Sequence, residues 1–510
     1  MKLIPRTRGG ALWRFFLGAV IVIGATAATT AVAGLLQFKQ LAADISLTPA
    51  LPNANVTLPS PGQPQTILII GSDHRAGTSH RTANTDTMLL VRLNGSSQTI
   101  NVLSVPRDLE VNIPGVGQAK LNEAYSVGGP NLLVKVLRQQ VFPTLHVNHI
   151  VDINFGGFED LVNAIGCVYA DVDHRYYNVS ALGPNDFSSI NIQPGYQKLC
   201  GPQALQFVRF RHTDSDLVRN ARQQDFIRWA KDQYGVDNLI ANRDKLLRIF
   251  GAHTQTDHNL HTLDGLINLF NLVAFSDGHT IKQIKFPAQF LPCDTTGVGG
   301  VPCYVAPTST AAEHGAFRAF MRATHSVPKA KHPSFGHGGH HSHKLSTAGL
   351  ISDVSDGKSQ SEAIHSVSMP VYFPKLIVDQ TEYCTSVTAN CDDGAEPETA
   401  YDGSYPRAYH IRDQQGHLHP AYRMTLVLNS LLGEYYGVQG TTWQSPPLLG
   451  SPSGTKVVDG RKLFLYAQGG SLTNVAWHTP QGVYWISNTL TTDISNQQMV
   501  AIAASLTRGA

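Results

Sequence analysis

From Thr66 onward, short apolar runs alternate with longer stretches in which apolar residues recur at helical spacing. The runs that predict strands cover 67–71, 87–93, 99–105, 149–153 and 167–172. The stretches that predict helices cover 130–141, 157–165, 202–207 and 222–234, with further helices over 238–250 and 263–275 and a last strand over 281–286. Strands alternating with helices of this length predict an α/β domain built on a sheet, which we expect over 66–307.

The amino terminus combines basic residues with a long uncharged stretch. Lys2, Arg6, Arg8 and Arg14 come without an acidic residue, and 15–38 carries no charge. About 20 apolar residues suffice to cross a membrane, and positive charge before the span keeps the amino terminus in the cytoplasm. We therefore expect a cytoplasmic 1–14, a transmembrane anchor over 15–38, and the remainder outside the cell membrane as a single-pass protein. A cleaved signal peptide is the alternative, since 31–33 resembles a small-residue cleavage site.

Composition narrows the class of protein. A chain of 510 residues exceeds one core, so two extracytoplasmic domains are expected. The formal net charge of +2 argues against nucleic acid as a partner. The six cysteines indicate an oxidising compartment, and fifteen pairings are possible, of which closure in sequential order is the simplest. None has the CxxC spacing of a zinc site.

Three further segments follow from composition. Residues 39–65 are polar and rich in proline, which predicts a spacer between the membrane and the first domain. The regular spacing of apolar residues is lost over 308–368. A histidine-rich tract at the centre of this range either chelates a metal or, as we prefer, is part of a flexible linker. Strand pairs and a final helix return over 369–508, predicting a smaller α+β accessory domain. Its aromatic residues either face a sugar or fill a core, which is the commoner outcome.

The most concentrated chemistry lies in the segment FVRFRHTDSDLVRNARQQ at 207–224. It holds Arg209, Arg211, Arg219, Arg222 and Gln223, with Arg228 just beyond. Two arginines lie two residues apart and the next return at helical spacing to a common face. Planar guanidinium groups that converge from two directions suit a phosphate or pyrophosphate. A solvated, salt-bridged helix start is the ordinary alternative.

Polar clusters also lie at the ends of three predicted strands, where α/β sheets bind ligands. Their candidate residues are Asp73, Arg75, Arg81, Asp86 and Arg107. Carboxylates beside arginines are the groups needed to hold a hydrated Mg²⁺ that bridges a pyrophosphate, since this ion takes one or two carboxylates and leaves its other positions to water and phosphate. Separately, each cluster could be a turn, a cap or a surface ion pair.

These stretches together resemble the LytR-CpsA-Psr family of cell-wall ligases. The matching segments are TILIIGSDHR, NTDTMLLV, INVLSVPRDLEVNIPGVGQAKLNEAYSVGGP, IVDINFGGFEDLVNAIGCV and FVRFRHTDSDLVRNARQQ, in that order, over about 66–234. The resemblance implies an α/β fold with a central mixed β-sheet flanked by helices. It also implies a membrane-anchored, Mg²⁺-dependent phosphotransferase that moves a glycopolymer from a polyprenyl-pyrophosphate carrier to peptidoglycan.

The same resemblance assigns roles to positions in this chain. Asp73 and Asp86 match the metal-associated acids, and Arg107 matches the arginine of the SxPRD motif. The pyrophosphate-contacting set matches Arg209, Arg211, Arg219, Arg222 and Gln223, with Arg75 and Arg81 as further substrate-binding candidates. One departure is Asn84, which stands where the family commonly has arginine, so that Arg81 would only partly substitute. An apolar tunnel for the lipid would be lined by 132–141 and 158–165, which could equally be ordinary core.

The sequence leaves two questions open. Asp108, Asp214 or Asp216 could act as general base in the transfer, and nothing in the sequence ranks them. The chain could instead be a non-catalytic binder of prenyl pyrophosphate or wall polymer that acts as an envelope scaffold or attenuator, or a pyrophosphatase with water as the acceptor.

Overall fold

The computed structural model describes residues 50–51, 56–58, 60, 62–72, 85–97, 99–178, 190–210, 214–234, 242, 245–246, 249, 252–262, 264, 268–269, 272, 279–291, 304–324, 346–385, 391 and 405–509. Within this part of the chain, no helix is both long and apolar enough to cross a membrane. The predicted anchor over 15–38 lies outside the described residues, as does the histidine tract. The anchor and the membrane location therefore stay predictions.

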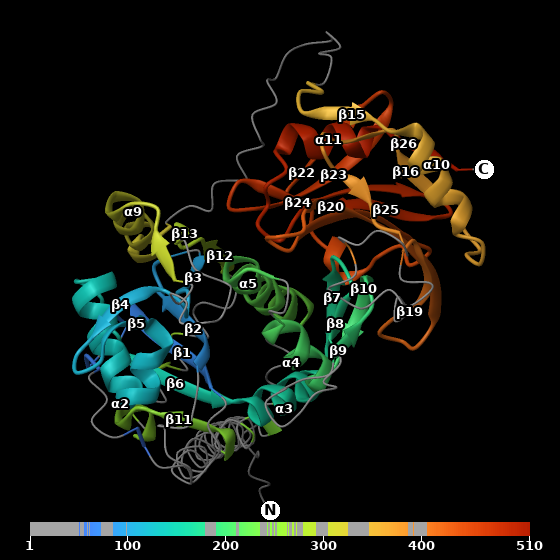
Figure 1. The fold of residues 1–510 in the computed structure, drawn as a ribbon. Helices are drawn as coiled ribbons and strands as arrows, with labels where there is room; N and C mark the ends of the chain where they lie inside the picture. The colour runs from blue at the N-terminus through green and yellow to red at the C-terminus, as the bar shows by residue number, and fades with distance from the viewer. Residues whose placement is uncertain are drawn as a thin grey trace, which may run out of the picture.

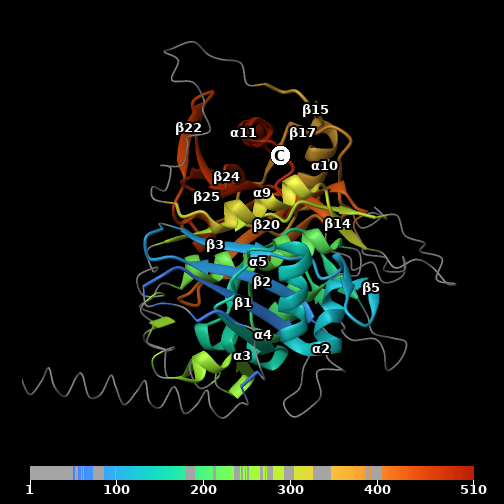
Figure 2. The same cartoon turned by 90° about the vertical axis from the view of Figure 1, so that its left-hand side faces the viewer.

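A six-stranded mixed sheet forms the centre of the first domain (Figures 1 and 2). Its spatial order is β11 (Thr254–Thr256), β6 (His149–Asn154), β1 (Gln65–Ser72), β2 (Thr85–Leu93), β3 (Thr99–Ser104) and β12 (Thr280–Ile284). β1 pairs in parallel with β6 and antiparallel with β2, and β12 is parallel to β3. This confirms the mixed α/β sheet and the strands predicted over 67–71, 87–93, 99–105, 149–153 and 281–286.

Side-chain alternation along β1 supplies both faces of this sheet with apolar groups. Leu68 and Ile70 point into the main core, whereas Ile67 packs on the opposite face with Leu260. The main core is closed by three helical elements, α2 (Leu121–Val136), the π-helical η2 (Leu137–Val141) and α9 (Thr310–Met321). Two short hairpins lie at its edge, β4 (Glu110–Ile113) with β5 (Gly117–Lys120), and β13 (Ala288–Phe290) with β14 (Val305–Pro307).

A second apolar cluster lies beside the sheet and carries the arginine-rich segment. It is built from three helices and two small strand pairs, α3 (Phe155–Ile165), α4 (Gly201–Arg209), α5 (Asp216–Gln233), β7 (Val168–Val172) with β10 (Gly195–Leu199), and β8 (Tyr176–Asn178) with β9 (Ile190–Ile192). A disulfide between Cys167 and Cys200 joins the start of β7 to the start of α4. The residues predicted to line a lipid tunnel are divided between this cluster and the main core, so the tunnel stays a prediction.

The carboxyl-terminal domain is an eight-stranded antiparallel sheet covered on one face by helices (Figure 1). Its sheet contains β18 (Glu382–Tyr383), β19 (Arg407–Arg412), β20 (Leu418–Asn429), β21 (Glu434–Thr441), β25 (Gly482–Ser487), β24 (Ser471–Thr479), β23 (Arg461–Gln468) and β22 (Gly454–Val458). Around it lie β15 (Leu350–Ser352), α10 (Val354–Ala363), β16 (Tyr372–Pro374), β17 (Leu376–Val378), the 3-10 turn η5 (Pro447–Leu449), α11 (Asn496–Ala504) and β26 (Leu506–Arg508). A further 3-10 turn, η3 (His258–His261), belongs to the first domain. Most of the tyrosines of this sheet, such as Tyr422 and Tyr436, are buried, so core is their principal role.

The predicted linker over 308–368 is too long. α9 begins at Thr310 and packs Phe317 and Phe320 on the sheet, while β15 and α10 belong to the second domain. Low complexity at the centre of this range obscured the apolar spacing at its two ends. Of the sequential cysteine pairings, Cys167–Cys200 and Cys384–Cys391 are formed, and the third pair, 293 and 303, lies outside the described residues.

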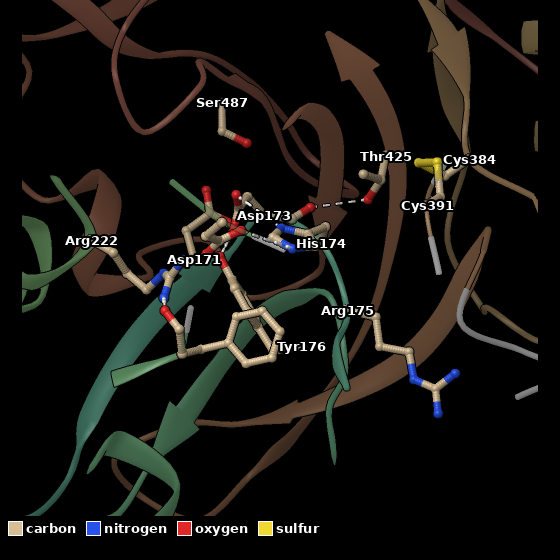
Figure 3. A network of polar contacts seen from close by, with 12 residues as sticks. Asp171, Asp173, His174, Arg175, Tyr176, Arg222, Cys384, Cys391, Thr425 and Ser487 are labelled. Carbon is tan, nitrogen blue, oxygen red and sulfur yellow. Dashed lines mark hydrogen bonds and ion pairs between the residues drawn. A yellow bond between two sulfur atoms is a disulfide. The ribbon is translucent and has the colours of Figure 1, made fainter. Parts of the chain in front are cut away.

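Buried polar contacts join the two domains (Figure 3). Arg423 of β20 forms an ion pair with Asp171 of β7, with 2.8 Å between Nη1 and Oδ1, and its side chain is fully buried. Thr425 donates to the Asp173 carbonyl at 3.2 Å, and the ring of His174 stacks on Tyr435 with centroids 4.0 Å apart. These buried contacts pack the two domains against each other, and removing one partner of the ion pair would leave the other charge buried and unpaired.

Candidate active site

Three side chains from distant parts of the sequence meet at the carboxylate of Asp86. Arg107 donates through Nη1 to Oδ1 of this aspartate, and Arg209 donates through Nε to Oδ2 at 3.1 Å. All three side chains are partly accessible, with 14% of Asp86, 21% of Arg107 and 29% of Arg209 exposed. Two guanidinium groups at one accessible point can hold a polyanion.

Arg107 is positioned by the segment that follows β3. Val105 donates its backbone N–H to Met88 of β2, which extends the sheet pairing by one residue. Beyond it, the carbonyl of Arg107 accepts from the N–H of Asn122 in the first turn of α2. The loop is therefore fixed at both ends, and the Arg107 side chain reaches Asp86 across the end of the sheet.

Arg209 lies at the last position of α4, and buried side chains from α5 fix that helix end. Arg222 donates through Nη1 to the carbonyls of Phe207 at 3.0 Å and Phe210 at 2.9 Å. Gln223 donates through Nε2 to the carbonyl of Val208 at 3.1 Å. The last carbonyls of a helix have no partner within the helix, so these contacts satisfy them and set the direction of Arg209. Its guanidinium also lies over the ring of Phe155, 3.8 Å from the centroid.

The electrostatics favour a charged Asp86. Burial alone would raise its pKa, but the guanidinium groups of Arg219, Arg209 and Arg107 outweigh that effect and lower the pKa below the ordinary value. Asp86 therefore carries negative charge at neutral pH and accepts hydrogen bonds from Arg107 and Arg209. A phosphate oxygen could replace either carboxylate oxygen on the same donors.

A second acidic group borders this site. Asp108 lies 3.2 Å from Nζ of Lys120 and 3.6 Å from Nε of Arg107, and its side chain is 4% exposed. Burial and the negative charge of Asp216 raise its pKa despite the two cations. A cavity of about 230 Å³ brings Asp108 together with Asp214 and Asp216, the three residues that the sequence offered as bases.

The remaining predicted ligands divide into two groups. Arg219 pairs with Asp216, and Arg222 pairs with Asp214 and lies 4.5 Å over the Tyr176 ring, so that both arginines are buried (Figure 3). α5 thus places their side chains in the interior, and their predicted contact with pyrophosphate stays a prediction. The others lie outside the described residues, at positions 73, 75, 81 and 211.

Two neighbours of the site were not singled out in the sequence. Lys120 ends the β4–β5 hairpin and reaches Asp108, and Phe155 begins α3 beneath Arg209. Both lie within the long stretches that carry the family resemblance, and both stand at a strand-to-helix junction. Their place at the junction between a strand and a helix could have pointed to them in the sequence, whereas their residue types could not.

Among the described residues, Asp86 is the carboxylate at the meeting point of the two arginines that could bind a magnesium ion. Among the described residues, no group of three or more His, Cys, Asp or Glu side chains is arranged to hold a metal. Mg²⁺ requires only one or two carboxylates, so Asp86 together with the acid at position 73 would be a sufficient donor set. Both oxygens of Asp86 are bonded to arginine, however, so one guanidinium would have to turn away.

Comparison with known proteins places this site in a family. The LytR_cpsA_psr family model matches residues 35–314, which include every element of the site. The polyisoprenyl-teichoic acid–peptidoglycan teichoic acid transferase TagU of Oceanobacillus iheyensis is 34% identical over 236 residues, covering 43% of this chain and 69% of that protein. TagT of Bacillus subtilis, of the same description, is 30% identical over 257 residues, covering 46% of this chain and 79% of that protein.

Solved structures give a weaker likeness. A TagT structure described with bound octaprenyl pyrophosphate lipid has a TM-score of 0.37 and 22% identity, covering 53% of this chain and 94% of that one. The assignment does not depend on it, because the family match spans more than half of the chain and both relatives are covered beyond two thirds of their length. The chain belongs to the LytR_cpsA_psr family.

Proposed function

We propose that the chain is a phosphotransferase that moves a glycopolymer from a polyprenyl-pyrophosphate carrier to peptidoglycan. The observation that carries this proposal is the convergence of Arg107 and Arg209 on Asp86. Family membership supports it, because the matched relatives are named as teichoic acid transferases of the same polyisoprenyl-linked kind. The identity of the polymer is not part of the proposal.

In this proposal the diphosphate of the carrier lies between the two accessible guanidinium groups. Planar donors can each bond two phosphate oxygens, and their fixed positive charge stabilises the charge that develops on the leaving phosphate. Asp86, released from one arginine, would hold Mg²⁺ with the acid at position 73. The ion would neutralise charge on the diphosphate oxygens when bound.

A hydroxyl of a peptidoglycan sugar attacks the phosphorus that is joined to the glycan. The bond from this phosphorus to the bridging oxygen breaks, and polyprenyl phosphate leaves with the electron pair. We assign the hydroxyl proton to Asp108, because burial and the charge of Asp216 raise its pKa in spite of Lys120 and Arg107. Asp108 also lies beside Arg107 of the site, whereas Asp214 and Asp216 are paired with the buried arginines of α5. Most of the acceleration comes from orientation and fixed charge.

The test compares three arginine variants in a transfer assay. The full-length protein in detergent is supplied with a polyprenyl-pyrophosphate-linked glycan, Mg²⁺ and peptidoglycan, and both polyprenyl phosphate and peptidoglycan-bound glycan are measured. Arg107→Ala and Arg209→Ala should each reduce transfer by roughly 10²- to 10³-fold, as for removal of a charge-stabilising donor. Arg318→Ala is the control, because Arg318 is exposed on α9 away from the site.

The two products separate the outcomes. Full activity in both site variants would refute the assignment. Release of polyprenyl phosphate without glycan on peptidoglycan would indicate a pyrophosphatase, and binding of the carrier without release of either product would indicate a non-catalytic binder.

A further inference from the structure

A second, larger cavity lies between the two domains. Its volume is about 540 Å³, within the usual range of about 300–1,000 Å³ for small-molecule sites. One wall is the face of α5 that carries Leu217, Asn220 and Gln224, and the facing wall comes from β21 and 490–493 of the carboxyl-terminal domain. Figure 1 shows α5 beside the central sheet, on the side of the carboxyl-terminal domain.

This cavity adjoins the candidate active site. Ser215, Phe290 and Leu432 line both it and the smaller cavity that holds Asp108, Asp214 and Asp216. The junction is formed by the turn between β20 and β21, where Ser215 donates its N–H to the Leu432 carbonyl at 3.4 Å. The next residue, Gly433, has φ of +76°, and a Cβ there would lie 2.3 Å from Asp214 Oδ1. Only glycine permits this approach, so the second domain is fitted to the site.

Several polar side chains line the walls. Ser104, at the end of β3, is 1% exposed and lines the cavity, and among the described residues its Oγ has no hydrogen-bond partner. A buried hydroxyl without a partner costs free energy, which a hydroxyl-bearing ligand can recover. The amides of Asn220 and Gln224 lie one helical turn apart on the same wall, and Phe286 adds an apolar surface.

The charge balance favours a neutral ligand. Glu434 lies beside Asp493, and its pKa is raised to about 7 by burial and by the hydrogen bond and charge of that neighbour. Lys285 faces the pair from the first domain and donates to the Thr491 carbonyl. Glu434 is therefore partly protonated at neutral pH, and the Lys285 ammonium offsets negative charge at this end, which leaves no excess of positive charge. A phosphate polymer would find no excess of positive charge here, whereas a sugar supplies hydroxyls and an apolar ring face.

We propose that this inter-domain cavity binds a neutral, polyhydroxylated saccharide adjacent to the reacting phosphorus. The inference rests on the proposed function for the direction of the reaction, but the cavity itself depends only on the two domains. The saccharide belongs either to the donor, as the first sugar of the carrier-linked glycan, or to the acceptor, as a peptidoglycan sugar. The carboxyl-terminal domain, which lies beyond the family match, thereby gains a role in substrate binding.

The test uses N,N′-diacetylchitobiose as a neutral disaccharide probe, titrated into the full-length protein in detergent and followed by ligand-observed NMR. Asn220→Leu and Gln224→Leu each remove an amide and fill part of the cavity, and each should weaken binding by about tenfold or more. Glu362→Gln is the control, since its side chain is half exposed on α10. Thermal unfolding midpoints check that each variant is folded, and wild-type protein that fails to bind the probe would overturn the proposal.

A prenyl pyrophosphate without sugar separates this inference from the proposed function. We expect its binding to be unchanged in Asn220→Leu and lost in Arg209→Ala. If the wild-type protein binds the lipid and not the disaccharide, the saccharide cavity is wrong and the phosphotransferase site stands. If it binds the disaccharide and not the lipid, the saccharide cavity stands and the phosphotransferase site is wrong. A prenyl-pyrophosphoryl sugar that displaces the disaccharide assigns the cavity to the donor, and binding of both together assigns it to the acceptor.

Discussion

Replacing Arg423 with methionine should separate the effect of the inter-domain ion pair from the effect of packing. Methionine keeps much of the side-chain length but removes the charge and the donors to Asp171, the Asp173 carbonyl, Gln439 and Ser487. Asp171 is 6% exposed and would keep only the N–H of Trp485, at 3.3 Å.

Leaving one charge of a buried pair without its partner costs about 3–5 kcal/mol. With a urea dependence of about 3 kcal/mol per molar, the midpoint of the corresponding transition should fall by roughly 1–1.7 M. The double variant Asp171→Asn, Arg423→Met no longer carries an unpaired charge and should recover a large part of this loss.

Urea unfolding followed by tryptophan fluorescence measures both effects, since Trp485 and Trp443 lie at the domain interface. The control is Arg318→Ala, on the exposed face of α9. A shift below about 0.3 M for Arg423→Met, or equal shifts for the single and double variants, would refute the view that an unpaired buried charge is what destabilises the interface.

Three further outcomes follow from other parts of the structure. Because the folded pKa of Glu434 is raised to about 7, the folded state holds its proton more tightly than the unfolded chain, and stability should fall as pH rises from about 4.5 to 7. Glu434→Gln should flatten this part of the pH dependence of thermal unfolding, and an unchanged slope would contradict the cause given. Replacing both Cys167 and Cys200 with alanine, which opens a loop of 33 residues, should cost ~3.5–4 kcal/mol by the chain-entropy estimate, and a melting point equal to that of the wild type would argue against it. EDTA should abolish glycan transfer and added Mg²⁺ should restore it, whereas activity that persists in EDTA would remove the metal from the proposal.

The fold of the first domain was largely predictable. Strand runs such as 67–71 and 149–153 are short, apolar and bounded by polar clusters, and these features depend on local sequence. The loss and return of periodicity predicted a second domain, and the carboxyl-terminal residues form a sheet of their own. The ends of the linker could not be predicted in this way, because the helix α9 begins among small and polar residues and is held by Phe317 and Phe320 packing on a distant sheet.

The candidate site was predictable in part. Arg107 and Arg209 were assigned to one anion site, and the structure brings both to Asp86. Helical spacing also placed Arg219 and Arg222 on one helix, but spacing does not reveal whether a face meets ligand or protein. Tertiary packing decided that these two arginines turn inward, to carboxylates and to the exposed carbonyls of α4.

The role of the second domain at the site had no local signal. Gly433 contacts Asp214 across more than two hundred positions of sequence, and the cavity beside α5 exists only when both domains are in place. Contacts of this kind depend on how the two domains pack, which periodicity within either domain does not encode.

A crystal structure of residues 66–510 with a prenyl pyrophosphate bound would test most directly whether Arg107 and Arg209 hold the diphosphate. The account predicts a diphosphate within hydrogen-bonding distance of both Arg107 and Arg209, with at least one of them withdrawn from Asp86. A diphosphate bound elsewhere, or one that contacts neither guanidinium while both remain on Asp86, would contradict it.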